Sequence, residues 1–97
     1  MKINHTLNGT SLTVSPEGRL DTVTAPALDA FLAENLAAAA SLTFDLAGLD
    51  YISSAGLRTL LTAKKKMAGK DVRVINPNDI VREIFEVTGF ADIFELD

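Results

Sequence analysis

Strand-like and helix-like stretches alternate along almost the whole chain, and this order is the feature that most restricts the fold. Residues 3–7 and 11–15 alternate between polar and apolar side chains, and the Asn8-Gly9 pair between them is typical of a tight hairpin turn. Pro16, Glu17 and Gly18 then interrupt the second strand or form a bulge in it. The chain is therefore expected to begin with two antiparallel strands.

Three helices and three further strands are expected after the hairpin. Apolar spacing, caps and helix-ending residues predict helices over 24–40, from Ser53 or Ser54 to Gly69, and from the caps Asn76, Pro77 and Asn78 to Gly89. Alternating or β-branched stretches predict strands at 42–46, at 71–75 and, on a sheet edge, at 92–96. The inner face of the second helix is expected to carry Leu57, Leu60, Leu61 and Ala68.

The resulting order, ββαβαβαβ, predicts an α/β fold with a mixed sheet and helices packed on at least one of its faces. A chain of 97 residues cannot divide its apolar side chains between two cores, so we expect a single domain over residues 1–97. Hydrophobic residues make up 47% of the chain and charged residues 23%, which is typical of a globular domain.

Composition and charge exclude several classes of function. Thirteen acidic and nine basic residues give a formal charge of −4, which disfavours direct nucleic-acid binding. The absence of cysteine excludes a thiol nucleophile, and a single histidine argues against the usual zinc sites. No stretch approaches the ~18 apolar residues of a membrane span, and no signal-peptide run is present at the start. We expect a cytoplasmic protein with no metal and no cofactor.

The most informative stretch leads from a strand end into a helix and reads Asp50-Tyr51-Ile52-Ser53-Ser54-Ala55-Gly56-Leu57-Arg58. Ser54 is expected at or beside the helix N-cap, where unpaired N–H groups and the helix dipole favour an anion. A phosphate there, with roughly −1.5 to −2 charges at neutral pH, would change the surface far more than the fold. Serines before a helix commonly serve only as caps, and the spacing alone leaves that interpretation open.

This stretch resembles the phosphoacceptor loop of the STAS family, in which bacterial anti-sigma factor antagonists carry an aspartate-serine-serine/threonine-glycine-leucine run. Aligned through Gly56-Leu57, Ser54 falls on the serine that is phosphorylated in the family. Ser53 replaces the usual aspartate, and Ala55 replaces the following serine or threonine. The resemblance implies that Ser54 is the phosphoacceptor.

A second match to the family is Gly18-Arg19-Leu20-Asp21, which is similar to a glycine-glutamate-leucine-aspartate run before the first helix. In the family the counterpart of Asp21 lies close to the phosphoacceptor and contributes to the partner-binding surface. From spacing alone, Asp21 is as well explained as a cap for the helix that begins near Thr24. The resemblance as a whole implies a partner-binding surface made of Asp21, Ser53, Ser54, Gly56, Leu57 and Arg58.

The function implied by the resemblance is that of an anti-sigma factor antagonist. The unmodified protein would bind an anti-sigma factor that is also a serine kinase, and the sigma factor would be released. Phosphorylation of Ser54 by that kinase would end the contact, and a phosphatase would restore it. The resemblance also allows a STAS subunit on the ATPase of an ABC-type lipid transporter, or a domain in a signalling scaffold.

A small enzyme is the remaining alternative, since the fold class alone does not determine activity. Asp45 and Asp50 could be imagined as the paired carboxylates of a hydrolase, but both are better explained as residues that flank a strand end. The turn around Ser54 lacks the first glycine of a nucleophile elbow, and no histidine follows it in the chain. We therefore expect a binding protein rather than an enzyme.

Overall fold

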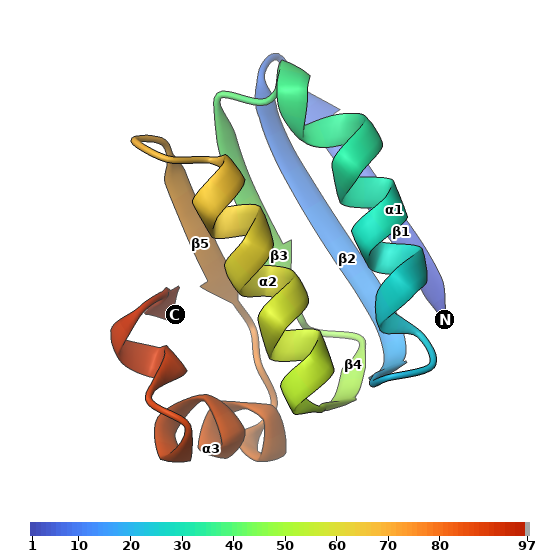
Figure 1. Cartoon of the computed structure of the whole chain (residues 1–97), viewed down its shortest axis with the longest axis vertical. Helices are drawn as coiled ribbons and strands as arrows, with labels where there is room; N and C mark the ends of the chain where they lie inside the picture. The colour runs from blue at the N-terminus through green and yellow to red at the C-terminus, as the bar shows by residue number, and fades with distance from the viewer. Residues whose placement is uncertain (97) are drawn as a thin grey trace.

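A computed structural model describes residues 1–96, and it begins with the expected hairpin (Figure 1). Strands β1 (Lys2–Asn8) and β2 (Ser11–Leu20) pair antiparallel, with no break in register between them. Gly9, the first of the two turn residues, has a φ of 64°. Glycine adopts this left-handed backbone more readily than any other residue, which is why a tight turn that continues the strand twist places it there.

The sheet is mixed, as predicted, and its strands lie in the order β1-β2-β3-β5-β6. The strands after β2 are β3 (Ser41–Asp45), β4 (Leu49–Ile52), β5 (Asp71–Ile75) and β6 (Glu95–Leu96). The first part of β2 pairs in parallel with β3, and its last residues pair in parallel with β4. The separate strand β4 was not anticipated. A turn at 46–48 separates it from β3, so the element order is ββαββαβαβ.

Pro16 does not interrupt β2, contrary to one of the two expectations for this segment. It lies opposite Ile3 and is buried. The missing N–H of proline costs nothing here, because β2 pairs with β3 only as far as Val14 and with β4 only from Gly18. The expected bulge is present, but it falls between Gly18 and Arg19.

In the described part of the chain three α-helices connect the strands: α1 (Ala25–Asn35), α2 (Ser54–Lys66) and α3 (Asp79–Val87). Helix α1 is shorter than predicted, because the Asn35 side chain donates to the Phe31 carbonyl and the chain tightens into a 3-10 turn, Leu36–Ala38. Helix α2 ends before Ala68, which is exposed rather than part of its inner face. Gly89 follows α3 with a φ of 80° and ends it as predicted.

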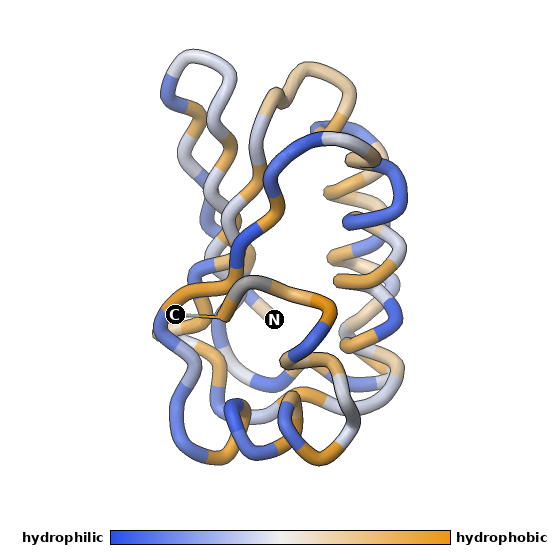
Figure 2. The backbone as a smooth tube through the Cα atoms, turned by 90° about the vertical axis from the view of Figure 1, so that its left-hand side faces the viewer, coloured by the Kyte–Doolittle hydropathy of each residue, from blue (hydrophilic) through white to orange (hydrophobic). Residues whose placement is uncertain are grey.

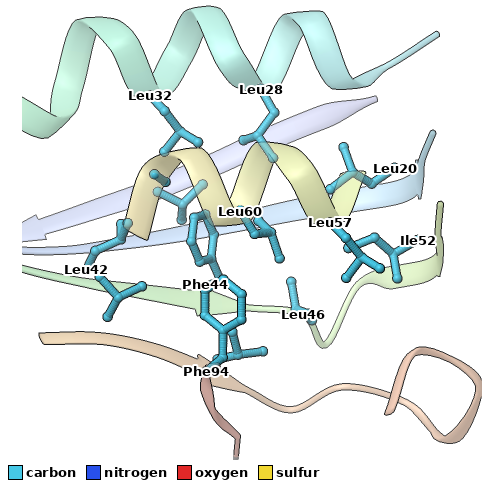
Figure 3. Packing of buried hydrophobic residues seen from close by; sticks show 14 of the residues in the cluster. Leu20, Leu28, Leu32, Leu42, Phe44, Leu46, Ile52, Leu57, Leu60 and Phe94 are labelled. Carbon is cyan, nitrogen blue, oxygen red and sulfur yellow. The ribbon is translucent and has the colours of Figure 1, made fainter. Parts of the chain in front are cut away.

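Helices α1 and α2 lie side by side over one face of the sheet, and α3 covers its lower end beside β4 (Figures 1 and 2). Their inner leucines meet alternate strand residues in one core that reaches from Leu28 and Leu32 to Phe44 and Phe94 (Figure 3). The Asn78 side chain caps α3 by accepting from the Val81 N–H at 2.8 Å. The same side chain donates to the Leu49 carbonyl of β4 at 3.1 Å, so the cap also attaches α3 to the sheet.

Candidate functional site

The ends of β2 and β4 bring two of the predicted site residues together. Leu20 and Ile52 are paired in the parallel ladder, so the next residues, Asp21 and Ser53, leave the sheet side by side. The Ser53 N–H donates to the Leu20 carbonyl at 2.9 Å, which extends the pairing by one step. The carboxyl ends of parallel strands meet at one edge of a sheet, and this edge is where α2 begins.

The first turn of α2 divides the two serines between two different environments. Ser53 is the N-cap: its backbone is extended (φ −97°, ψ 176°) and its Oγ accepts from the Gly56 N–H at 3.4 Å. Ser54 is the first helical residue and is exposed, and its hydroxyl makes no hydrogen bond within residues 1–96. The capping interpretation therefore accounts for Ser53 and leaves the hydroxyl of Ser54 free to react.

Gly56 and Leu57 hold this turn against the core and do not contribute side chains to the surface. A Cβ on Gly56 would lie 2.7 Å from Leu20 Cγ and 2.8 Å from Ile52 Cγ1, so only glycine allows the helix to approach the strand ends this closely. The Leu57 side chain is 1% exposed (Figure 3). The expectation that these two residues contact a partner is corrected: their burial leaves them a positioning role for Ser53 and Ser54.

Asp21 organises the loop between β2 and α1. Its Oδ1 accepts from the N–H groups of Val23 at 3.0 Å and Thr24 at 3.1 Å. The Thr24 hydroxyl accepts from the Asp21 N–H at 2.9 Å and donates to the Arg19 carbonyl at 2.7 Å. Asp21 therefore shapes the turn that precedes α1 rather than capping the helix, whose N-cap is Thr24 without a side-chain cap bond, and the Asp21 side chain stays partly exposed.

The pKa of Asp21 is lowered from its ordinary value of 3.8, mainly by the hydrogen bond from the Thr24 backbone. Partial desolvation opposes this, and the Val23 N–H, the Thr24 hydroxyl and the Arg19 charge add to the lowering. A carboxylate with a lowered pKa stabilises the fold above its unfolded-state pKa, and this contribution is lost as the pH falls through the folded-state pKa.

We therefore expect Asp21→Asn to reduce the acid sensitivity of the fold, because the amide keeps an acceptor for the loop but cannot be protonated in this range. Thermal melts at about pH 6 and about pH 2.5 should show a smaller drop in Tm for the variant than for the wild type. Asp50→Asn is the matched control, since the exposed Asp50 side chain accepts no hydrogen bond within residues 1–96. An equal drop in all three proteins would contradict the stabilising role of the Asp21 charge.

Arg58 lies four residues after Ser54 on α2 and is exposed. Residues four apart lie on the same side of a helix, so its guanidinium can reach the space above the Ser54 hydroxyl. It lines an open groove of about 380 Å³ between the starts of α1 and α2, together with Thr22, Pro26 and Ala55. Within the described part of the chain its side chain has no ion-pair partner, and it is available to an incoming anion.

Three neighbours of the site were not found from the sequence. Arg19 lies over the ring of Tyr51, with its guanidinium carbon 4.5 Å from the ring centroid, and the two are paired across β2 and β4. Val23 is 85% exposed at the tip of the loop that Asp21 holds. For Val23 the available signal was Asp21, because an aspartate side chain commonly accepts from the backbone N–H two residues later and so forms a turn there.

The other candidate groups do not form a second site. Asp45 ends β3, where its carboxylate accepts from the Ala47 N–H at 3.1 Å and from the Asn76 side chain, so it shapes a turn as expected. Across residues 1–96, no three histidine, aspartate or glutamate side chains gather where they could hold a metal ion. In the same range no helix is long and apolar enough to cross a membrane.

Comparison with known proteins identifies the family. The model of the STAS domain matches residues 2–97, which is nearly the whole chain. The chain belongs to the STAS domain family. A Bordetella bronchiseptica protein, BtrV, provisionally named an anti-sigma factor antagonist, is 44% identical over 54 residues. That match covers 52% of this STAS chain and only 45% of BtrV.

Solved structures of anti-sigma factor antagonists share the fold closely. An anti-sigma factor antagonist from Mycobacterium paratuberculosis superposes with a TM-score of 0.90 at 26% identity, over 98% of this chain and 83% of that chain. The anti-sigma factor antagonist SpoIIAA in its unphosphorylated form gives 0.85 at 15% identity, over 99% and 88%. The phosphorylated form of Bacillus SpoIIAA gives 0.76 at 14% identity, over 99% and 91%, so the two SpoIIAA matches establish the fold alone.

Proposed function

We propose that this STAS protein is an anti-sigma factor antagonist that binds an anti-sigma factor with serine kinase activity and is switched off when Ser54 is phosphorylated. The observation that carries the proposal is the free, exposed hydroxyl of Ser54 at the start of α2, next to a neighbouring serine that already provides the cap. The names of BtrV and of the Mycobacterium paratuberculosis protein support the class of function.

The start of α2 can accept a phosphate without rearrangement. The first N–H groups of a helix lack intrahelical partners, and an anion near them contributes about 0.3–1 kcal/mol to stability. Arg58, one turn further along the same side, offers a fork of N–H donors to the phosphate. Phosphorylation would thus add roughly −1.5 to −2 charges to the surface while the first turn keeps its packing on Leu20 and Ile52.

The proposed partner-binding surface consists of the exposed or partly exposed residues Asp21, Val23, Ser53, Ser54 and Arg58, and is called the Ser54 surface below. In the unmodified protein it combines one carboxylate, one guanidinium, two hydroxyls and an exposed valine. A phosphate in its centre makes this surface negatively charged and engages Arg58, so the contact with the anti-sigma factor weakens. A phosphatase restores the binding form, and the cycle operates in the cytoplasm together with the sigma factor.

The proposed role is binding rather than catalysis. A serine that attacks a substrate needs a neighbouring base, and no side chain within residues 1–96 is hydrogen-bonded to the Ser54 hydroxyl. The single histidine, His5, lies opposite Val14, six residues before the strand end at Leu20. At the rise of a β-strand this is about 20 Å, far beyond the reach of proton transfer.

Phosphopeptide mapping tests the assignment of the acceptor. We expect the cognate anti-sigma kinase and ATP to add one phosphate to the wild type and to Ser53→Ala, and none to Ser54→Ala. Ser53→Ala should lose about 0.5–2 kcal/mol of stability, because it removes the cap. A phosphate found on Ser53 alone would show that the acceptor is Ser53 and not Ser54.

Co-purification from the native cell with an ABC-type ATPase, and with no anti-sigma factor, would contradict the proposed function itself.

A further inference from the structure

The outer edge of β1 is a long and regular unpaired strand edge. Within residues 1–96 the sheet order places β1 at one end, with β2 as its only neighbour, while β6 at the other end has just two residues. Its seven residues include no proline, no glycine and no bulge, and one positive charge at the start, Lys2. Natural edges are usually protected by such features, because an unprotected edge pairs readily with another strand.

The hairpin geometry determines which backbone groups face outward. In a hairpin with a two-residue loop, the residues that flank the turn, here Asn8 and Ser11, form a hydrogen-bonded pair, and every second pair after them does the same. The intervening residues of β1 are Ile3, His5 and Leu7. Their N–H and C=O groups therefore point away from β2, which gives three donors and three acceptors along the open edge.

The side chains of the same three residues lie on the face of the sheet that carries the helices. Ile3, His5 and Leu7 are opposite the buried residues Pro16, Val14 and Leu12, and paired residues share a face. The His5 ring lies 4.9 Å from the ring of Phe31 in α1, which crosses over this part of the sheet (Figure 1). Leu7 is 53% exposed, so the edge presents an apolar side chain next to its unpaired backbone.

We propose that β1 pairs antiparallel with β1 of a second copy of the chain, about a two-fold axis through His5. In this register His5 faces His5 of the second copy, and Ile3 faces Leu7 on either side. The outward N–H and C=O groups of all three residues are then satisfied by about six hydrogen bonds. The two sheets become one continuous sheet, and both copies of α1 lie on the same side of it.

The pattern of β1 fits a second copy because it is self-complementary about His5. The exposed Leu7 is covered by Ile3 of the second copy, and the reverse contact occurs across the axis. Lys2 faces the neutral Asn8, so no like charges meet directly. The two His5 and Phe31 ring pairs come together at the axis, where aromatic contacts add to the backbone pairing.

A single pair of seven-residue strands forms a small interface, below the roughly 1,200 Å² of stable complexes, so the dimer should be weak. We expect a Kd of about 10–500 µM. The β1 edge is separate from the Ser54 surface, since His5 is opposite Val14 in the middle of β2 and not near its end. The proposal therefore holds whether or not Ser54 is phosphorylated.

Sedimentation equilibrium of the full chain from about 5 µM to about 1 mM tests the association. The wild type should pass from monomer to dimer over this range. His5→Lys should weaken the dimer at least about tenfold, because two lysines would face each other at the axis. Thr6→Lys is the matched control: it adds the same charge one residue away on the opposite face of the sheet, and its Kd should stay within about threefold of the wild type.

Amide hydrogen exchange locates the interface without any substitution. The N–H groups of Ile3, His5 and Leu7 should become protected as the protein concentration rises, whereas those of Asn4 and Thr6 should be protected at every concentration. A protein that stays monomeric at about 1 mM overturns the proposal. So does a dimer in which these three amides still exchange freely, or an association that grows beyond two copies. If His5→Lys shows no cooperative thermal unfolding and is therefore not folded, the hydrogen exchange of the wild type alone tests the proposed dimer.

Discussion

Ser54→Ala is expected to keep the protein permanently competent to bind its anti-sigma factor, while the phosphorylated wild type should bind at least about tenfold more weakly. The alanine variant loses only an exposed hydroxyl that makes no hydrogen bond within residues 1–96, so the Ser54 surface and the Ser53 cap remain in place. The phosphate instead places an anion in the centre of that surface, and a misplaced interfacial charge can weaken binding by several kcal/mol. Titration calorimetry with the purified anti-sigma factor measures the difference directly.

The same phosphate should hardly change the stability of the fold. The exposed N–H groups at the start of α2 favour an anion, so thermal melts of the two forms should agree within a few degrees or slightly favour the phosphorylated one. Phosphoserine incorporated during translation at position 54 provides the modified protein independently of any kinase. A phosphorylated form that melts far lower, or shows a broadly changed amide spectrum, would indicate switching by local unfolding and would contradict the surface-charge mechanism.

Gly56→Ala is expected to destabilise the protein by about 1–3 kcal/mol, although alanine is the better helix former by about 1 kcal/mol. The added methyl group would lie 2.7 Å from Leu20 Cγ, 2.8 Å from Ile52 Cγ1 and 3.0 Å from the Leu20 carbonyl. All three atoms belong to packed strand ends, so α2 must move outward and carry Ser53 and Ser54 with it. For a domain of this size the expected fall in Tm is about 5–20 °C, measured by circular dichroism.

Gly48→Ala is the matched control for this prediction. A Cβ on Gly48 would also meet a side-chain atom at 2.8 Å, but that atom is Glu17 Cγ, in a flexible and only partly buried side chain that can turn away. Its effect should therefore stay within about 0.5 kcal/mol. Equal destabilisation by the two variants would mean that the close packing of α2 on β2 and β4 does not hold the start of the helix.

Local signals in the sequence predicted most elements of the fold. The hairpin at Gly9, the cap at Asn78 and the helix end at Gly89 lie where the residue types placed them, because each depends on backbone preferences of one or two residues. The predictions failed where a distant partner decides the outcome. Residues 49–52 form a strand of their own because the end of β2 is free to pair with them.

The candidate site divides in the same way. The sequence, with its family resemblance, located the Ser54 region and the order of its residues, and the structure brings Asp21 beside Ser53 through the pairing of Leu20 with Ile52. The sequence could not distinguish the residues exposed at the site from those that pack beneath it. Leu57 looked like a contact residue in the motif, but it lies in the core. Asp21 proved to be engaged by its own loop, through hydrogen bonds whose donors follow it in the chain.

The sequence by itself determined the α/β class, the approximate start of each helix and the presence of two serines at the start of α2, since these follow from residue preferences and short-range spacing. Only the tertiary structure decided that Ser53 is the cap and Ser54 the free hydroxyl, that Gly56 must be glycine, and that β1 ends the sheet with an open edge. These depend on which segments pair across long distances in the chain. Such pairing is set by the burial of the whole core, which no local stretch of residues contains.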